Sequence, residues 1–513
     1  MAYQAGPAKA SQAIVIGAGL GGLAAAMRLG AKGYEVTVLD RLARAGGRGS
    51  SITQDGYRFD LGPTMITVPH IYEQLWADCG RDFHADVTLK AMDPYYEIRW
   101  PDGSNFYVTG DTKLMETEVA RLNPADVPGY RRFLEESRKR YVAAFEGLMF
   151  KPMQDLWETI KVLPAFAWLR ADQSILKLAR KYVKDERLRM ALSFHPLFIG
   201  GDPSRVTSMY ALVSYLEKEY GVFYTMGGVQ AICDAMVRVI EEQGGRVHFG
   251  VDVDEILVTD GQASGVRFGD GEVLHAPIVV SNADAGHTYE TLLRNHKVPG
   301  WSRASTKRRW SMSLFIWYFG TSGTREMWKD LGHHTILSGP RYEGLLNDIF
   351  IKGKLADDMS VYIHRPALTD PTAAPAGGDS FYVLSPVPHL GFDNGVDWAR
   401  EEAIYKRKMA RVLGDVMPGF QDHIETEIVF TPETFRDMYL SPHGGGFSIE
   451  PRILQSAWFR PHNVSRLPGL FLVGAGTHPG AGVPAVVASA EVMAQLVPDA
   501  PTPLAPELPM AAE

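Results

Sequence analysis

The feature that most constrains this chain is a glycine-rich turn near its start, in Ala13-Ile-Val-Ile-Gly-Ala-Gly-Leu-Gly-Gly-Leu23. Gly17, Gly19 and Gly22 fit the pattern G-x-G-x-x-G between an apolar strand and a helix. Gly17 permits the tight turn, Gly19 lets the backbone approach a pyrophosphate, and Gly22 lets the helix lie close to the strand. The free N–H groups and the dipole of the helix N-terminus favour a phosphate there. The turn therefore predicts a dinucleotide-binding strand-turn-helix unit.

A carboxylate stands where this unit needs one for a ribose. Asp40 closes a second apolar run, Val36-Thr-Val-Leu, about 20 residues beyond the glycines. Its oxygens are expected to accept hydrogen bonds from ribose hydroxyls. Taken alone, this motif leaves a nicotinamide dehydrogenase open, but such an enzyme does not explain the glycines further along the chain.

One of those later glycine motifs lies near the other end of the chain. Leu470-Phe-Leu-Val-Gly-Ala-Gly-Thr reads as a buried strand running into a glycine turn, and residues 485–497 read as a helix. This repeats the phosphate-binding arrangement of the N-terminal unit. We expect one cofactor to be held between both ends of the chain, with other lobes inserted between them.

Composition limits the class of protein. At 513 residues the chain is expected to form two or three lobes, and 45% hydrophobic with 22% charged residues is typical of a soluble globular protein. The net charge of -8 argues against a nucleic-acid partner. The N-terminal residues lack a signal-peptide pattern, and no apolar run is long enough for a transmembrane helix.

Neither the cysteines nor the paired histidines predict a metal site. Cys79 and Cys233 are far apart and lack ligand spacing, which favours two reduced thiols in a cytoplasmic protein. His333 and His334 are adjacent, and no residue nearby has ligand spacing. Since neighbouring histidines seldom converge on one ion, we predict no metal.

Several motifs resemble known flavoenzymes. Gly46-Gly-Arg48 and Asp60-Leu-Gly-Pro-Thr64 resemble the flavin-binding loops of amine-oxidase-like FAD enzymes. Residues 469–483 resemble the C-terminal signature of bacterial carotenoid desaturases of the phytoene-desaturase type. Three further segments are similar to that family, namely Ser456–Asn463, Ser193–Gly201 and Pro386–Gly391.

The resemblance implies an α/β fold, with a discontinuous Rossmann-like FAD-binding domain and an inserted substrate domain. That substrate domain is expected to contain a mixed or antiparallel sheet and a helical lid. The implied boundaries are 11–70, 221–285 and 466–497 for the FAD-binding domain, 71–125 and 286–465 for the substrate-binding domain, 126–220 for the lid, and 498–513 for a disordered tail.

The resemblance also implies FAD as cofactor. Asp40 stands where the family more often has Glu, and the rest of the implied set comes from both ends of the chain. The implied cofactor-binding residues are Gly17, Gly19, Gly22, Asp40, Gly47, Arg48, Gly62, Pro63, Thr64, Val253, Gly476, His478, Gly482 and Val483.

The implied reaction is desaturation of phytoene to lycopene or neurosporene, with hydride transfer to flavin and loss of a proton. Oxygen or a quinone is the expected electron acceptor. Asp155, His195 and His462 are the candidate acid-base residues. Another carotenoid dehydrogenase, an isomerase or a ketolase on the same fold stays open, as does a non-catalytic flavin- or carotenoid-binding protein.

A lipid-soluble substrate needs a route from the membrane. Residues 151–190 hold nine Lys/Arg and five Asp/Glu, a net charge of +4, with Leu156, Ile160 and Leu163 at helical spacing near Trp157. A basic, aromatic-rich helix suits an anionic bilayer surface. We therefore expect a cytoplasmic protein attached peripherally to the cytoplasmic membrane. An amphipathic helix packed on its own core is the alternative.

Overall fold

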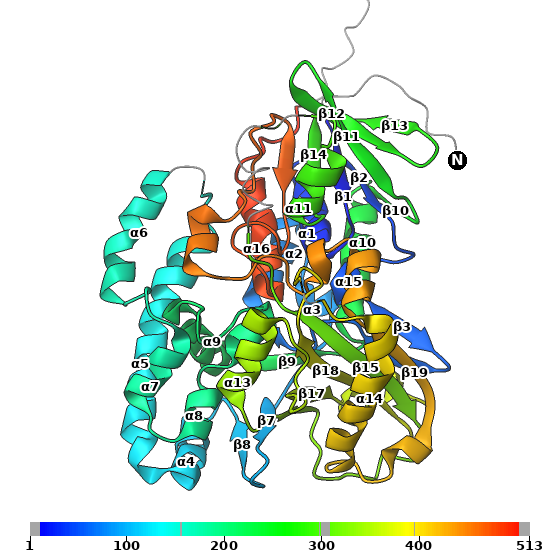
Figure 1. The fold of residues 1–513 in the computed structure, drawn as a ribbon. Helices are drawn as coiled ribbons and strands as arrows, with labels where there is room; N and C mark the ends of the chain where they lie inside the picture. Colours follow the sequence, from blue (N-terminus) through cyan, green and yellow to red (C-terminus); the bar gives the residue numbers. More distant parts are fainter. Residues whose placement is uncertain (1–10, 154–155, 297, 299–307, 394, 502–513) are drawn as a thin grey trace, which may run out of the picture.

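The computed structural model describes residues 11–153, 156–296, 298, 308–393 and 395–501. In this part of the chain helices cover one parallel sheet and lie beside a larger mixed sheet, so the predicted α/β fold class is confirmed (Figure 1). The expected tail, 498–513, lies outside the described residues from position 502 onward.

A five-stranded parallel sheet joins segments that are far apart in the sequence. Its strand order is β10-β2-β1-β14-β20. All four neighbouring pairs are parallel. Both glycine turns therefore start from the same sheet, which consists of β1 (Gln12–Ile16), β2 (Glu35–Asp40), β10 (Arg246–Phe249), β14 (Ile278–Ser281) and β20 (Leu470–Leu472).

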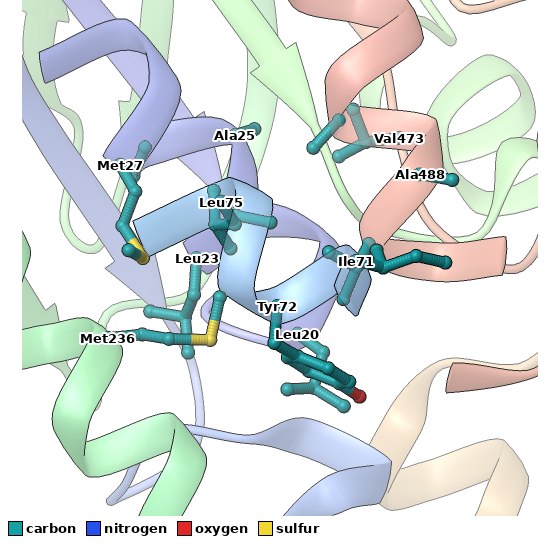
Figure 2. Packing of buried hydrophobic residues seen from close by; sticks show 14 of the residues in the cluster. Leu20, Leu23, Ala25, Met27, Ile71, Tyr72, Leu75, Met236, Val473 and Ala488 are labelled. Carbon is teal, nitrogen blue, oxygen red and sulfur yellow. The ribbon is translucent and has the colours of Figure 1, made fainter. Parts of the chain in front are cut away.

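Four helices pack into one apolar core beside this sheet. They are α1 (Leu20–Ala31), α2 (His70–Asp78), α10 (Val229–Glu242) and α16 (Val483–Ala494). Figure 2 shows Leu23 and Met27 of α1, Leu75 of α2 and Met236 of α10 gathered in this core, and Ala488 of α16 beside it. Burying large side chains here contributes about 1.5–3 kcal/mol each, which fixes where the two glycine turns lie.

The larger sheet has seven strands in the order β19-β15-β18-β17-β16-β7-β8. Its only parallel pair among the described strands is β16 with β7. The helix α14 (Trp398–Gly414) packs its apolar face on Phe315 and Trp317. The strands are β7 (Tyr96–Arg99), β8 (Asn105–Val108), β15 (Ser313–Thr321), β16 (His334–Leu337), β17 (Val361–His364), β18 (Asp379–Val387) and β19 (Ile424–Phe430).

Smaller sheets and short helices complete the two layers. A three-stranded antiparallel sheet, β11-β12-β13, stands beside the parallel sheet. Two further small sheets have the strand orders β5-β9-β6 and β3-β4. Their bounds are β3 (Ser51–Gln54), β4 (Tyr57–Asp60), β5 (Ile66–Thr67), β6 (Leu89–Ala91), β9 (Val222–Thr225), β11 (Val253–Thr259), β12 (Gln262–Phe268) and β13 (Glu272–His275), with helices α3 (Phe83–Asp86), α11 (Ala285–His287), α13 (Tyr342–Asn347) and α15 (Pro432–Tyr439).

A helical layer stands at one side of the molecule, with α6 at its outer edge (Figure 1). None of the helices in the described ranges combines the length and the apolar character that crossing a bilayer requires. The layer comprises α4 (Thr112–Leu122), α5 (Val127–Arg140), α6 (Leu156–Trp168), α7 (Ile175–Tyr182), α8 (Glu186–Ala191) and α9 (Leu212–Tyr220).

Candidate active site

Asn282, directly after β14, packs between the two glycine turns. Its amide nitrogen donates to the carbonyl oxygen of Gly17 at 3.4 Å. A Cβ atom on Gly19 would lie 2.8 Å from Nδ2 of Asn282, and one on Gly474 would lie 2.6 Å from Oδ1. Both turns therefore need glycine to approach the same side chain. Asn282 is absent from the residues predicted from sequence, although it directly follows a buried strand, as cofactor-contacting residues of α/β folds often do.

A large apolar cavity opens beside these turns. Its volume is about 1190 Å³, and it extends from the glycine turns to α6 and the loop around Ile453. Twelve of the fourteen predicted cofactor-binding residues line it, namely Gly17, Gly19, Asp40, Gly47, Arg48, Gly62, Pro63, Thr64, Val253, His478, Gly482 and Val483.

Two helices begin at the wall of this cavity without a side-chain cap. The N-cap residues are Gly19 for α1 and Gly482 for α16, and neither offers a side chain to the first-turn N–H groups. Both helices have twelve residues, and their first residues line the cavity. Uncapped N–H groups with a positive dipole end suit a diphosphate.

Asp40 and Arg48 supply the charges near these helix ends. Asp40 accepts hydrogen bonds from the N–H of Ala18 at 2.6 Å and of Leu42 at 2.7 Å, while burial raises the pKa of its carboxyl. Nε of Arg48 is buried and has no hydrogen-bond partner among the described residues, and burial lowers the pKa of its guanidinium. A guanidinium with an unpartnered buried nitrogen beside uncapped helix ends fits an anionic cofactor.

Two of the predicted cofactor residues lie away from the cavity wall. A Cβ atom on Gly22 would collide with the carbonyl oxygen of Gly17, so this glycine serves the helix-strand packing expected of it. Gly476, expected beside the flavin, does not line the cavity itself. A Cβ atom there would lie 2.9 Å from the backbone nitrogen of Ala285, so close packing against that loop explains the glycine.

His478 lines the cavity and is almost fully buried. Its Nε2 donates to the carbonyl oxygen of Leu148 at 3.2 Å, and Nδ1 has no hydrogen-bond partner in the described structure. Burial lowers the pKa of the imidazole to about 4. The ring is therefore neutral near pH 7, and because Nε2 carries the proton, the free Nδ1 can accept a hydrogen bond.

Of the two predicted acid-base residues that the structure describes, His195 lines the cavity and His462 does not. Nε2 of His195 lies 3.2 Å from the phenol oxygen of Tyr96 and 3.3 Å from Oε2 of Glu217. Tyr96 also donates to Oε2 of Glu217 at 2.9 Å. Glu217 itself lines the cavity. No sequence pattern signals this buried trio, because helix α9 brings Glu217 to the strand of Tyr96 only in the fold.

His462 does not line the cavity, and its Nε2 donates to the carbonyl oxygen of Trp458 at 3.0 Å. Asp155 lies outside the described residues.

The far end of the cavity reaches an apolar rim on the surface. Leu163 of α6 lines the cavity and is 52% exposed, and Phe459 on the facing loop also lines it. Trp157 and Trp168 are 57% and 72% exposed. Ile160, Ile453 and Leu454 add to the exposed apolar surface. Such a patch on a monomer marks an interaction site.

Comparison with known proteins agrees with this geometry. The family model for flavin-containing amine oxidoreductases matches residues 20–498. The chain is 64% identical to a neurosporene-forming phytoene desaturase of Cereibacter sphaeroides, over 96% of this chain and 95% of that protein. It is 42% identical to a lycopene-forming phytoene desaturase of Paracoccus sp., over 95% and 97%.

Solved structures support the fold. An oxidoreductase from Methanosarcina mazei superposes with a TM-score of 0.64 at 19% identity, covering 94% of this chain and 99% of that one. At this identity the likeness concerns the fold alone.

Proposed function

The chain belongs to the flavin-containing amine oxidoreductases, as a bacterial-type phytoene desaturase homologue with FAD as its cofactor, and from this premise we propose that it desaturates phytoene to neurosporene. The higher identity to a neurosporene-forming relative than to a lycopene-forming one supports this product. Lycopene would require one further desaturation.

The observation that carries the proposal is the continuous apolar cavity between the glycine turns and the α6 rim. A polyene has no charge and no hydrogen-bonding group, so an apolar tunnel can bind it only through shape and exclusion of water. We propose that the side chains of Leu197, Phe198 and Leu314 hold the chain of the substrate, since all three line the cavity.

The residues present fit FAD. The N-termini of α1 and α16 are proposed to hold the diphosphate with Arg48, and Asp40 the ribose hydroxyls. Val253 is proposed to lie at the adenine, and Gly47, Gly62, Pro63, Thr64, His478, Gly482 and Val483 along the rest of the cofactor. When bound, FAD would supply the group that accepts a hydride from the substrate.

Removal of the proton falls to the protein. We propose that Glu217, with His195 and Tyr96 bonded to it, accepts the proton from the carbon next to the oxidised one. Asp155 remains a further proposed base. The surrounding apolar wall keeps water away from the reacting carbons.

The membrane contact is also proposed. The exposed Trp157, Leu163 and Trp168 on α6 would dip into the cytoplasmic face of the membrane, so that phytoene enters the cavity from lipid. Oxygen or a membrane quinone would then reoxidise the flavin.

The test is pigment analysis with purified protein in liposomes that contain phytoene, with oxygen in one arm and a quinone under anaerobic conditions in the other. Neurosporene as main product is expected. Lycopene as main product would contradict the product assignment. A preparation that forms no coloured polyene and leaves its flavin oxidised would contradict the desaturase activity and favour a non-catalytic binding protein. If the only product is an isomerised or an oxygenated carotenoid, the result would favour an isomerase or a ketolase.

A further inference from the structure

The side chains of three buried histidines lie close together at two neighbouring strands of the seven-stranded sheet. His334 begins β16, His364 ends β17, and the two stand opposite each other in the antiparallel register. His333 precedes β16, and its ring centroid lies 4.3 Å from that of His334 and 4.8 Å from that of His364. A nitrogen atom from each ring lies within 4.8 Å of the other two. Sequence spacing does not reveal this convergence, because the third ring comes from the neighbouring strand.

Each of the adjacent histidines has one nitrogen engaged and one unengaged. Nδ1 of His333 lies 2.6 Å from Oγ1 of Thr369, and Nδ1 of His334 lies 2.7 Å from the phenol oxygen of Tyr362. The Nε2 atoms of both rings are buried and have no hydrogen-bond partner in the described part of the chain. A metal-binding histidine is commonly arranged in this way, with a polar partner on one nitrogen and the ion on the other.

His364 has a carboxylate nearby. Its Nε2 lies 3.5 Å from Oδ2 of Asp60, and the histidine is fully buried. Neither ring nitrogen of His364 has a hydrogen-bond partner among the described residues, and neither has Oδ1 of Asp60. Arg58, paired with Asp370 at 2.6 Å, is the nearby cation.

We propose that His333, His334 and His364 bind one divalent transition-metal ion, of which Zn²⁺ is the best match. Three imidazoles favour Zn²⁺ over Mg²⁺ or Ca²⁺, which prefer oxygen ligands. Asp60 acts as the outer partner of His364 or as the fourth ligand. Zinc bonds of about 2.1 Å hold ligand atoms no more than about 4.2 Å apart, so the rings turn slightly inward on binding.

The ion would have a structural role. Asp60 ends β4, and the next residues, Leu61 to Thr64, line the cavity. Tyr362, bonded to His334, also bonds to Thr64 at 2.6 Å. An ion at the histidines therefore ties β16, β17 and the loop after β4 into one rigid wall. No redox step is involved, because Zn²⁺ has no accessible second oxidation state.

The test is elemental analysis of full-length protein, without a polyhistidine tag, from cells grown in zinc-supplemented medium. About one zinc ion per chain is expected, with a lower unfolding temperature after removal by a chelator and recovery when ZnCl₂ is restored. Substitution by Co²⁺ should give visible bands at longer wavelength than the flavin absorption. Protein that takes up neither zinc nor cobalt at this stoichiometry would overturn the proposal.

Matched variants locate the ion. His364→Gln and, separately, His333→Gln should lower the zinc content at least tenfold, whereas the exposed His84→Gln should retain it. Retention of zinc in a folded, flavin-containing His364→Gln or His333→Gln protein would contradict the assignment. Should both variants fail to fold, the cobalt spectrum of the wild type decides, since tetrahedral bands support the site and their absence refutes it. Zinc content does not depend on the substrate, so this test fails or succeeds independently of the proposed desaturation.

Discussion

Oγ1 of Thr64 and the phenol oxygen of Tyr362 share a buried hydrogen bond of 2.6 Å at the cavity wall. It joins the loop after β4 to a strand of the larger sheet. Replacing Tyr362 by Phe leaves both Thr64 and His334 without this partner, so we expect a loss of about 1–3 kcal/mol in the free energy of unfolding. Urea denaturation of the flavin-loaded protein measures it.

A double-mutant cycle with Thr64→Val separates the bond from the loss of volume. If the two groups interact as the structure shows, the double variant should be less destabilised than the sum of the single variants. Additive losses would mean that the bond contributes nothing to stability.

The close approach of α1 to its own turn makes a second prediction. A Cβ atom at Gly22 would meet the carbonyl oxygen of Gly17, which cannot move without opening the turn. We expect Gly22→Ala to destabilise the protein by about 3 kcal/mol and to reduce bound flavin.

Gly414, at the end of α14, has open space where a Cβ atom would stand. Gly414→Ala is thus the matched control and should be neutral or slightly stabilising. Equal unfolding temperatures for the two variants would refute the packing argument.

The local features of the site could be predicted from sequence because each depends on neighbouring residues. The turn at Gly17 and Gly19 and the acid at Asp40 are encoded in short patterns, and the structure places all three residues at the cavity wall.

The remaining features depend on contacts between distant segments. Asn282 lies between two turns that are separated by most of the chain, and Glu217 meets Tyr96 across two elements. The convergence of His364 with His334 follows from strand register, which alternation of apolar residues does not specify. The close approach of Gly476 to Ala285 has the same origin, because Ala285 belongs to another segment.

Burial of His478 predicts a pH dependence of stability. Its pKa is about 4 in the folded protein and about 6.5 when exposed, so between these values the unfolded chain binds the proton more strongly. Stability therefore falls as the pH is lowered from 6.5 toward 4. Between pH 7 and pH 5 this group should cost about 2 kcal/mol. The unfolding free energy of His478→Gln should fall by that much less over the same interval in urea titrations, and parallel pH profiles would contradict the assignment.

Glu217 is the residue whose charge the proposed chemistry needs. Glu217→Gln keeps the shape of the side chain and can still accept the hydrogen bond from Tyr96, but it cannot hold the proton. Turnover of phytoene should fall about 10²–10⁴-fold with flavin content unchanged. His195→Gln, which acts through Glu217, should have a smaller effect on rate and should shift the pH profile. Near-normal turnover by the Glu217→Gln enzyme would contradict this role and would mean that another group accepts the proton. Asp155 would then be the first residue to test.

Substitutions in the exposed apolar rim on α6 should weaken membrane binding without lowering the stability of the protein. Trp157 and Trp168 are mostly exposed, so replacing both by Ala should hardly change the unfolding temperature. If these rings enter a bilayer, each contributes about 1.5–3 kcal/mol of binding, and the double variant should bind anionic vesicles at least tenfold more weakly in co-sedimentation.

Leu114 is an exposed apolar side chain on α4, so the control variant Leu114→Ala should bind vesicles like the wild type. Because the cavity opens beside α6, the double variant should also lose turnover with phytoene in liposomes while keeping its flavin. Unchanged vesicle binding would assign α6 to a contact other than lipid.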